Sequence, residues 1–267
     1  MERLKEIERS IIKKYRKEIW SKYVKGVKEF EMIKENDKIA VCISGGKDSF
    51  LLAKCMQELL RHKKFHYELE FIVMNPGYND ENIIKIKENL KILGIDAHIF
   101  DTPIFDVADK TDNPCYLCAR MRRGYLYSYA QKLGCNKIAL GHHFDDVIET
   151  ILMNILYTGN YASMMPKLHS DNFKGMELIR PLYFVREKDI KSWAKYNGLE
   201  FIDCACSVTK KKIGKRQEVK ELVQKLNEMY KEADKCIFAS SFNVNLNTVI
   251  GYKKGNEKYT FMDDYDM

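Results

Sequence analysis

The chain has 267 residues, of which 45% are hydrophobic, with a mean hydropathy of −0.41 and a formal net charge of +7. This composition excludes a disordered or fibrous chain and indicates a globular protein with a sizeable core. No apolar run in the sequence approaches the ~20 residues that span a bilayer, and the N-terminus lacks an apolar signal segment, so we expect a cytoplasmic protein without a membrane partner.

The first 30 residues carry apolar side chains every three or four positions, from Leu4 to Val27, which predicts a long amphipathic helix. We expect residues 1–35 to pack as a helical segment on a main domain of residues 36–240. Residues 241–267 are expected to form a C-terminal tail with a frayed, acidic end.

Short apolar runs then alternate with helical patterns. Strands are predicted at residues 38–43, 69–75, 96–100 and 136–143, and helices at 48–62, 81–94, 119–133 and 145–157. This alternation predicts an α/β fold, with a doubly wound parallel sheet covered by helices on both faces. Residues 160–185 are expected to be rich in loops. A helix at 186–198, a short strand, a basic loop and a helix at 218–233 are expected to follow.

The stretch SGGKDS links the first predicted strand to a helix. Its two glycines can turn consecutive backbone N–H groups inward as an anion nest, and the helix start adds its positive dipole end. Lys47 supplies a mobile charge for phosphate oxygens, and Asp48 can hold a bridging divalent cation. An accidental strand-to-helix turn is the alternative. The candidate phosphate-binding residues are Ser44, Gly45, Gly46, Lys47, Asp48 and Ser49.

Eight cysteines in a chain without an export signal are not expected to form disulfides. Half of them lie in apolar patterns and are expected in the core: Cys42, Cys55, Cys135 and Cys236. The other half lie beside polar or turn-forming residues: Cys115, Cys118, Cys204 and Cys206.

The pair Cys115 and Cys118 is a Cys-x-x-Cys motif, which suits a redox dithiol, half of a zinc site or two ligands of an iron–sulfur cluster. The phosphate loop argues against a thioredoxin-like dithiol. Cys204 and Cys206 are the other candidate ligands. Three thiolates suit a cluster with one free iron and four suit structural zinc, and unconnected thiols are a third interpretation.

A second polar motif, GHHFDD, follows the strand predicted at 136–143. It places Gly141, His142, His143 and Asp145 at the carboxyl edge of the sheet, where open α/β folds bind ligands. These side chains can coordinate Mg²⁺ or contact ATP and substrate, whereas a purely structural role for the two histidines is the alternative.

With SGGKDS unbroken, the chain resembles the PP-loop ATP pyrophosphatases, which cleave ATP between the α and β phosphates and adenylate a substrate oxygen. The order of SGGKDS, CYLCARMRRGYLY, KIALGHHFDDVIETILMN, MMPKL and IRPLYFVREKDI is similar to the bacterial tRNA 2-thiocytidine synthetases, from about residue 20 to 220. That resemblance implies ATP, Mg²⁺ and a [4Fe–4S] cluster as cofactors, and replacement of a cytidine C2 oxygen by sulfur in the tRNA anticodon loop.

Carried over by motif, the resemblance implies cluster ligands at Cys115, Cys118 and Cys206, with Cys204 as the alternative third ligand. The family has two cysteines separated by two residues and then Gly-Ser-Gln, whereas this chain has Ala205 alone between its cysteines and then Ser-Val-Thr. The implied catalytic residues are Asp48 and the three cysteines. Beyond the phosphate loop, the implied ATP contacts are Met74, Gly141, His142 and Asp145.

Basic residues after the cysteines and in the loop TKKKIGKRQ suit RNA phosphates, although a solvated loop is equally compatible. The candidates are Arg122, Arg123, Lys211, Lys212 and Lys215. Expected partners are tRNA and a sulfur donor, either a cysteine desulfurase or free sulfide, and PP-loop enzymes often pair as homodimers. The rival hypotheses are a uridine thiolase, a lysidine-type ligase, a small-molecule PP-loop enzyme with structural zinc, and a non-catalytic RNA-binding or redox-sensing protein.

Overall fold

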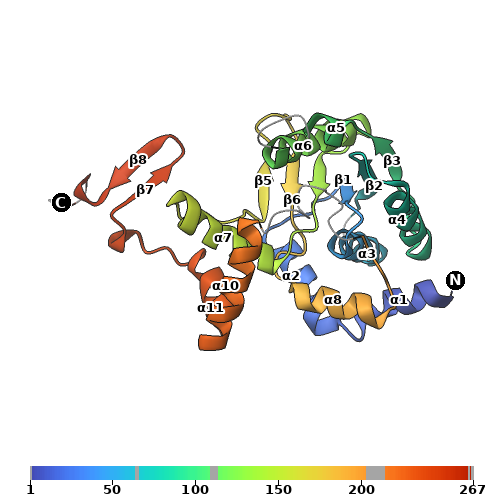
Figure 1. Ribbon diagram of the computed structural model, residues 1–267, viewed down its shortest axis with the longest axis horizontal. Coiled ribbons are helices and arrows are strands. Elements are labelled where there is room, and N and C mark those ends of the chain that lie inside the picture. Colours follow the sequence, from blue (N-terminus) through green and yellow to red (C-terminus); the bar gives the residue numbers. More distant parts are fainter. Residues whose placement is uncertain (1, 64–65, 109–113, 203–213, 264, 266–267) are drawn as a thin grey trace.

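The computed structural model describes residues 2–63, 66–108, 114–202, 214–263 and 265, and its central feature is a mixed sheet flanked by helices (Figure 1). The strands of this sheet are β1 Lys38–Ile43, β2 Glu68–Asn75, β3 His98–Asp101, β4 Lys137–Ala139, β5 Lys167–His169 and β6 Glu177–Ile179. Their order is β3-β2-β1-β4-β6-β5, with every pair parallel except β5 and β6. The predicted doubly wound parallel sheet is therefore confirmed, with an antiparallel edge strand added.

The helices and a small hairpin complete the described chain. The helices are α1 Glu2–Ile12, α2 Ser21–Glu29, α3 Lys47–Arg61, α4 Asp80–Ile92, α5 Ile104–Ala108, α6 Pro114–Lys132, α7 Phe144–Thr158, α8 Glu187–Tyr196, α10 Lys215–Met229 and α11 Ala233–Ser240. The hairpin consists of β7 Gly251–Lys254 and β8 Glu257–Thr260, and it projects away from the sheet at the C-terminal end of the chain (Figure 1). None of the described helices is long and apolar enough to cross a membrane.

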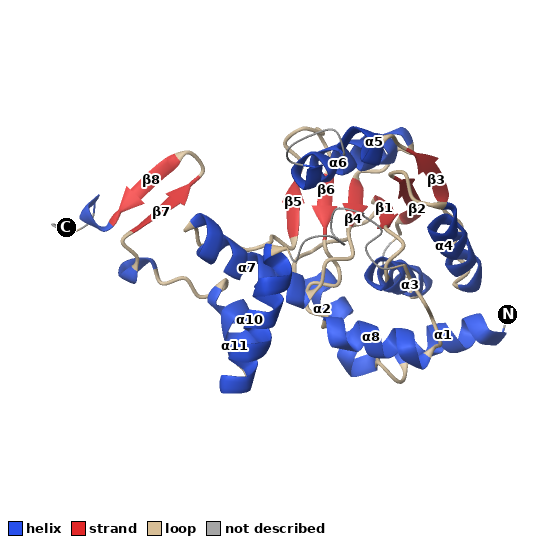
Figure 2. Cartoon of the chain, viewed as in Figure 1, coloured by secondary structure: helices blue, strands red, loops and turns tan. Residues whose placement is uncertain are grey.

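Alternation along β1 explains why helices cover both faces of the sheet. Ile39 and Val41 point into the larger core cluster, which α3 completes, whereas Ala40 and Cys42 join a smaller cluster with side chains of α6. Figure 2 shows α3 and α6 on opposite sides of the sheet. A strand buried on both sides must be apolar at every position, as KIAVCI nearly is.

The N-terminal segment departs from the single long helix that its apolar spacing predicts. A π-helical turn at Arg16–Trp20 separates α1 from α2, and it is entered where the Tyr15 N–H donates to the carbonyl of Ser10. Ile7 on α1 and Tyr23 on α2, on either side of this wide turn, are nevertheless both buried in the larger core cluster. The turn thus keeps the apolar stripe on the core.

Four further predictions differ from the structure. The short strands β5 and β6 lie within the segment expected to be loops, and the hairpin β7–β8 lies within the tail. Residues 199–202 form no strand, because the N–H of Ile202 donates to the carbonyl of Gly45 instead of a strand neighbour. Cys236 is exposed, since Asp234 and Phe238 occupy the inward face of α11. Cys42, Cys55 and Cys135 are buried as expected.

Candidate active site

The two polar motifs meet at the point where the strand order reverses. From β1 the chain proceeds outward to β2 and β3, whereas β5 and β6, which follow β4 in the chain, both lie on the opposite side of β4. Open α/β sheets bind ligands at the carboxyl ends of strands flanking such a point. The loops that follow β1 and β4 therefore define the candidate site.

The phosphate loop has an internal frame that fixes its backbone. Gly45 has φ +89°, and a Cβ there would lie 2.5 Å from Cδ1 of Ile202, so both conformation and space demand glycine. The buried Ser49 hydroxyl accepts from the N–H of Ser44 at 3.2 Å and donates to the carbonyl of Gly46 at 2.8 Å. The first turn of α3 thus has the form of an anion site, because the first N–H groups of a helix have no acceptor within it.

The second motif reaches this loop through Gly141. A Cβ on Gly141 would lie 3.0 Å from the carbonyl carbon of Asp48 and 3.0 Å from the nitrogen of Ser49. The backbone after β4 therefore lies directly against the first turn of α3. This packing explains the glycine of the GHHFDD motif.

We expect Gly141→Ala to weaken ATP binding and to lower the free energy of unfolding by about 1–3 kcal/mol, because its methyl group would press on backbone atoms that cannot rotate away. Isothermal titration with an ATP analogue and thermal unfolding would measure the two effects. The matched control is Gly124→Ala in α6, where nothing lies within 4 Å of the added Cβ. Equal behaviour of the two variants would contradict the close approach.

Asp48 has a buried carboxylate oxygen, Oδ1, that lacks a hydrogen-bond partner among the described residues. The nearest basic nitrogen that the structure gives for it, Nε2 of His143, lies 3.8 Å away. Buried carboxylate oxygens without a donor are rare because desolvation is costly. An oxygen left open in this way fits a divalent cation such as Mg²⁺, which prefers oxygen ligands.

Lys47 lies between two carboxylates. Its Nζ is 3.2 Å from Oδ2 of Asp48 and 3.1 Å from Oε1 of Glu187, at the start of α8. Burial opposes its charge, but these two carboxylates raise the pKa of Lys47 above the ordinary value. The lysine therefore stays charged, and phosphate oxygens entering the loop can take over from Glu187 as its partners.

Glu187 binds three lysines at once. Burial alone would raise its pKa, but Lys220, Lys47 and Lys191 together lower the pKa of Glu187 to about 2. A carboxyl group with a lowered pKa in the folded state stabilises the fold fully above about pH 4.5 and loses that contribution as the pH falls toward about 2. The start of α8 is thus tied electrostatically to the phosphate loop.

We therefore expect the wild type to lose stability between about pH 4.5 and 2 by more than Glu187→Gln does, because the variant has no carboxylate to protonate. Melting temperatures of both proteins across this range provide the comparison. If the melting temperatures of the two proteins fell equally with pH, the result would contradict stabilising ion pairs between Glu187 and its lysines.

His142 is held as a neutral ring. Burial and the nearby guanidinium of Arg180 lower the pKa of His142 to about 4. Nε of Arg180 donates to Nδ1 of His142 at 3.2 Å. Because an arginine N–H can only donate, Nδ1 accepts and the ring proton lies on Nε2. His142 can therefore offer one N–H donor to a ligand at neutral pH.

The other polar residues of the motif have structural contacts in this conformation. His143 caps α7, accepting from the N–H of Asp146, whose carboxylate accepts from the N–H of His143 in return. Oδ2 of Asp145 accepts from the N–H of Glu187 at 2.7 Å and so joins α7 to α8. Arg216 bonds Asp146 and Glu149. Only some of this motif is therefore available to a ligand.

The cysteine motif lies in α6, which begins at Pro114 and not near residue 119 as predicted. Cys115 and Cys118 are thus one turn apart in the same helix, and Cys118 is a partly buried free thiol. The side chain of Cys115 and all of Cys204 and Cys206 lie outside the described residues. Within the described part, two cysteines spaced by one helical turn fit two ligands of a cluster.

A chain of contacts joins this helix to the phosphate loop. The guanidinium of Arg122 lies 5.6 Å from the ring of Phe105, which packs edge-on against Tyr78 at 5.9 Å. The hydroxyl of Tyr78 donates to the carbonyl of Ser44 at 3.3 Å. Nε of Arg122 is buried and has no acceptor among the described residues. Successive side-chain contacts therefore connect the cysteine helix with the phosphate loop.

The remaining candidate residues are dispersed. Arg123 and Arg180 line a cavity of about 370 Å³ between α6 and β6. Lys215 lies 4.6 Å from the centre of the Tyr157 ring, at the start of α10. Met74 is buried near the carboxyl end of β2, whereas Lys211 and Lys212 lie outside the described residues.

Comparisons with known proteins identify the family of this chain. A PP-loop domain model matches residues 15–226. A curated tRNA-cytidine(32) 2-sulfurtransferase of Syntrophotalea carbinolica is 39% identical over 76% of this chain and 80% of its own length. The chain belongs to the PP-loop family, among the tRNA-cytidine(32) 2-sulfurtransferases. The protein of the same description from Geobacter metallireducens is 36% identical over 87% of this chain and 91% of its own length.

A solved structure supports the fold. The U34-tRNA thiolase NcsA from Methanococcus maripaludis, determined with its [4Fe–4S] cluster, matches with a TM-score of 0.66 at 23% identity. The match covers 88% of this chain and 80% of NcsA. The PP-loop architecture predicted from SGGKDS is thereby confirmed.

Three residues of the site were missed by inspection of the sequence. Arg180 and Glu187 belong to the segment IRPLYFVREKDI, which was recognised as a motif without roles for its side chains. Arg216 was counted only as part of a basic loop. The polar character of these three side chains does not indicate which residues of other elements they contact.

Proposed function

We propose that the protein is an ATP-dependent tRNA thiolase that replaces the C2 oxygen of a cytidine with sulfur, as the names of its relatives suggest for position 32. The observation that carries the proposal is the contact chain from Ser44 through Tyr78 and Phe105 to Arg122. It supports the proposal because it connects the phosphate loop with the Cys-x-x-Cys helix. A small-molecule PP-loop enzyme has no need of that pairing.

In the proposed reaction, ATP lies with its phosphates on residues 44–49, where Lys47 neutralises charge and Asp48 would hold Mg²⁺. The cytidine C2 oxygen attacks the α-phosphorus and pyrophosphate departs, so that the oxygen becomes part of an AMP leaving group. A sulfur nucleophile then attacks C2 and AMP leaves. When bound to Cys115, Cys118 and one of Cys206 or Cys204, a [4Fe–4S] cluster would supply an iron position for that sulfur.

The sulfur donor in this proposal is free sulfide or the persulfide of a cysteine desulfurase, and the setting is the cytoplasm. Sulfide is already at the oxidation level of the thiocarbonyl product and needs no reductant. The outer sulfur of a persulfide is two electrons more oxidised, so its delivery also needs a thiol reductant, which is converted to a disulfide. The basic net charge of +7 favours approach of the polyanionic tRNA.

The test of this proposal is the tRNA dependence of ATP cleavage. Protein purified without oxygen should convert ATP to AMP and pyrophosphate when given tRNA and sulfide, and release of both products should fall sharply without either one. Cleavage to ADP and phosphate, or cleavage indifferent to tRNA, would contradict adenylation of an RNA base.

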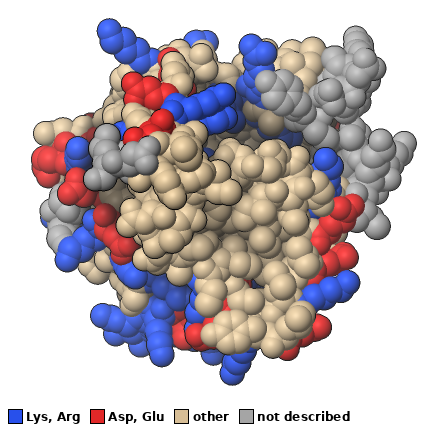
Figure 3. All heavy atoms as spheres, turned by 90° about the vertical axis from the view of Figure 1, so that its left-hand side faces the viewer, with Lys and Arg blue, Asp and Glu red and all other residues tan. Residues whose placement is uncertain are grey.

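We further propose that the protein forms a homodimer through its C-terminal face. The hairpin β7–β8 carries stacked Tyr252 and Tyr259 on only two strands, and such a hairpin is marginally stable without a partner. Exposed apolar side chains extend from the end of α7, at Ile155 and Leu156, to Ile250. Figure 3 shows a broad uncharged area on this face. Light scattering should give a dimer that loses the ability to pair when residues 244–267 are deleted, and a monomeric wild type would overturn the proposal.

A further inference from the structure

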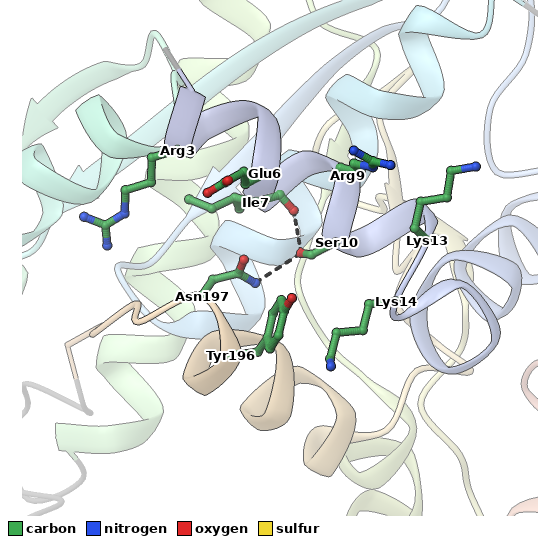
Figure 4. Close-up of a pocket in the computed structure, with 9 residues that line it drawn as sticks. All are labelled: Arg3, Glu6, Ile7, Arg9, Ser10, Lys13, Lys14, Tyr196 and Asn197. Carbon is green, nitrogen blue, oxygen red and sulfur yellow. Dashed lines mark hydrogen bonds between the residues drawn. The ribbon is translucent and has the colours of Figure 1, made fainter.

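A basic groove lies between α1 and the end of α8, apart from the site described above. Figure 4 shows the two helices facing each other across a cavity of about 720 Å³. The cavity is lined by Arg3, Glu6, Ile7, Arg9, Ser10, Lys13, Lys14, Tyr196 and Asn197.

The charge of this groove is strongly one-sided. Four cationic side chains line it, against the single carboxylate of Glu6. In the described part of the chain, no carboxylate lies within 4.0 Å of the side-chain nitrogens of Arg9, Lys13 or Lys14, whereas Lys22 and Lys25 on α2 both have acidic partners. Exposed lysines usually alternate with acids, so a row of unpaired cations over a hollow favours a polyanion.

An aromatic ring is presented beside these cations. Tyr196 is 57% exposed although its edge packs against Tyr15, with ring centres 6.0 Å apart. Nζ of Lys14 lies 4.2 Å from the centre of the Tyr196 ring. A fixed tyrosine next to unpaired cations is typical of nucleic-acid surfaces, where phosphates bind the cations and a base or ribose packs on the ring.

The groove is rigid because polar bonds join its two walls. Nδ2 of Asn197 donates to the buried Ser10 hydroxyl at 3.1 Å, as drawn in Figure 4, and the hydroxyl of Tyr15 donates to the carbonyl of Ser192 at 2.9 Å. Arg3 also donates to the carbonyl of Gly198 at 3.3 Å. A ligand therefore meets a preformed surface and costs little ordering entropy on binding.

The end of α8 also connects this groove with the phosphate loop. A second cavity, of about 690 Å³, is lined by Lys191, Lys195 and Gly198 together with Lys47 and Asp48 of the loop. Tyr196 and Asn197 of the groove lie between Lys195 and Gly198 in the chain. A strand of RNA lying in the groove can thus continue around the end of α8 toward the catalytic residues.

We propose that the groove between α1 and α8 binds the sugar–phosphate backbone of the substrate tRNA outside the reacting nucleotide. This proposal rests on the proposed function, since it takes tRNA as the substrate. The groove positions the substrate and supplies affinity, whereas its residues take no part in the chemistry.

The test compares two triple variants that remove the same charge. Arg9→Gln/Lys13→Gln/Lys14→Gln empties the groove of its unpaired cations, and Lys5→Gln/Arg16→Gln/Lys17→Gln removes three exposed cations of the same segment that do not line it. Kd for unmodified tRNA is measured by filter binding over about 50–200 mM salt, and thiolation by steady-state kinetics.

We expect the groove variant to raise Kd and KM for tRNA about tenfold or more, to reduce the slope of log Kd against log salt by about two to three, and to keep kcat within about twofold. The control variant should stay near the wild type. Equal losses in both variants, or a groove variant that binds tRNA normally, would overturn the proposal even if the wild type thiolates tRNA. A wild type that neither binds nor thiolates tRNA would instead refute the proposed function.

Discussion

Replacing Asp48 by asparagine is expected to lower kcat/KM for tRNA-dependent ATP cleavage about 100- to 1000-fold without lowering the melting temperature. The carboxylate oxygen Oδ1 is buried and has no donor among the described residues, so it contributes no hydrogen bond to the fold. Lys47, which pairs with Oδ2, keeps Glu187 as a second partner when Asp48 is replaced. ATP chemistry needs that charge to hold a cation against the phosphates. Asp48→Asn should therefore lose activity while keeping the stability of the wild type.

The matched control is Asp80→Asn. Asp80 also lies in the first turn of a helix that follows a strand of the sheet, but it is exposed and α4 is capped by Asn79. Its replacement should leave AMP formation within about twofold of the wild type. A stability loss in Asp48→Asn as large as its activity loss would contradict the account, because it would make Asp48 a structural residue.

Replacing Cys115 or Cys118 by alanine is expected to abolish bound iron and thiolation while leaving ATP affinity within a few-fold of the wild type. The phosphate loop is built by residues of β1, α3 and Ile202, so its frame does not depend on the cysteine helix. Iron, sulfide and zinc would be quantified after purification without oxygen, beside Cys204→Ala and Cys206→Ala. Loss of the cluster in only one of these two variants would identify the third cysteine ligand.

Cys236→Ala serves as the control for this series, since Cys236 is an exposed free thiol on α11. It should retain about four irons and four sulfides per chain, as a [4Fe–4S] cluster requires. One zinc per chain without iron or sulfide would contradict the cluster and favour the structural-zinc interpretation of the four cysteines.

The first half of the fold was predictable from the sequence because local signals there are strong. KIAVCI followed by SGGKDS combines an apolar run with two consecutive glycines, which indicate a tight turn after a strand. β1 and α3 begin within a residue or two of their predicted starts. The three-residue strands β5 and β6 were missed because so short an element has no periodicity. β6 pairs with β4, elsewhere in the chain, and β5 pairs with β6.

Several residues of the candidate site were predicted from the sequence, but their contacts were not. The placement of Gly141 against the first turn of α3 explains its glycine only once the two strand ends are adjacent. His143 was expected to contact ligands, yet it caps α7, and capping depends on a geometry that spacing alone does not reveal. The bond from Arg180 to His142 joins residues 38 positions apart, for which the sequence holds no signal.

The measurement that tests the central claim most directly is nucleoside analysis of treated tRNA by mass spectrometry. Unmodified tRNA is incubated without oxygen with the iron-loaded protein, ATP, Mg²⁺ and sulfide, then digested to nucleosides. We predict that 2-thiocytidine appears, that it requires ATP, and that Asp48→Asn and Cys118→Ala fail to form it. The appearance of 2-thiouridine instead would contradict the assignment of the base, and the absence of any thionucleoside while ATP is consumed would contradict tRNA thiolation itself.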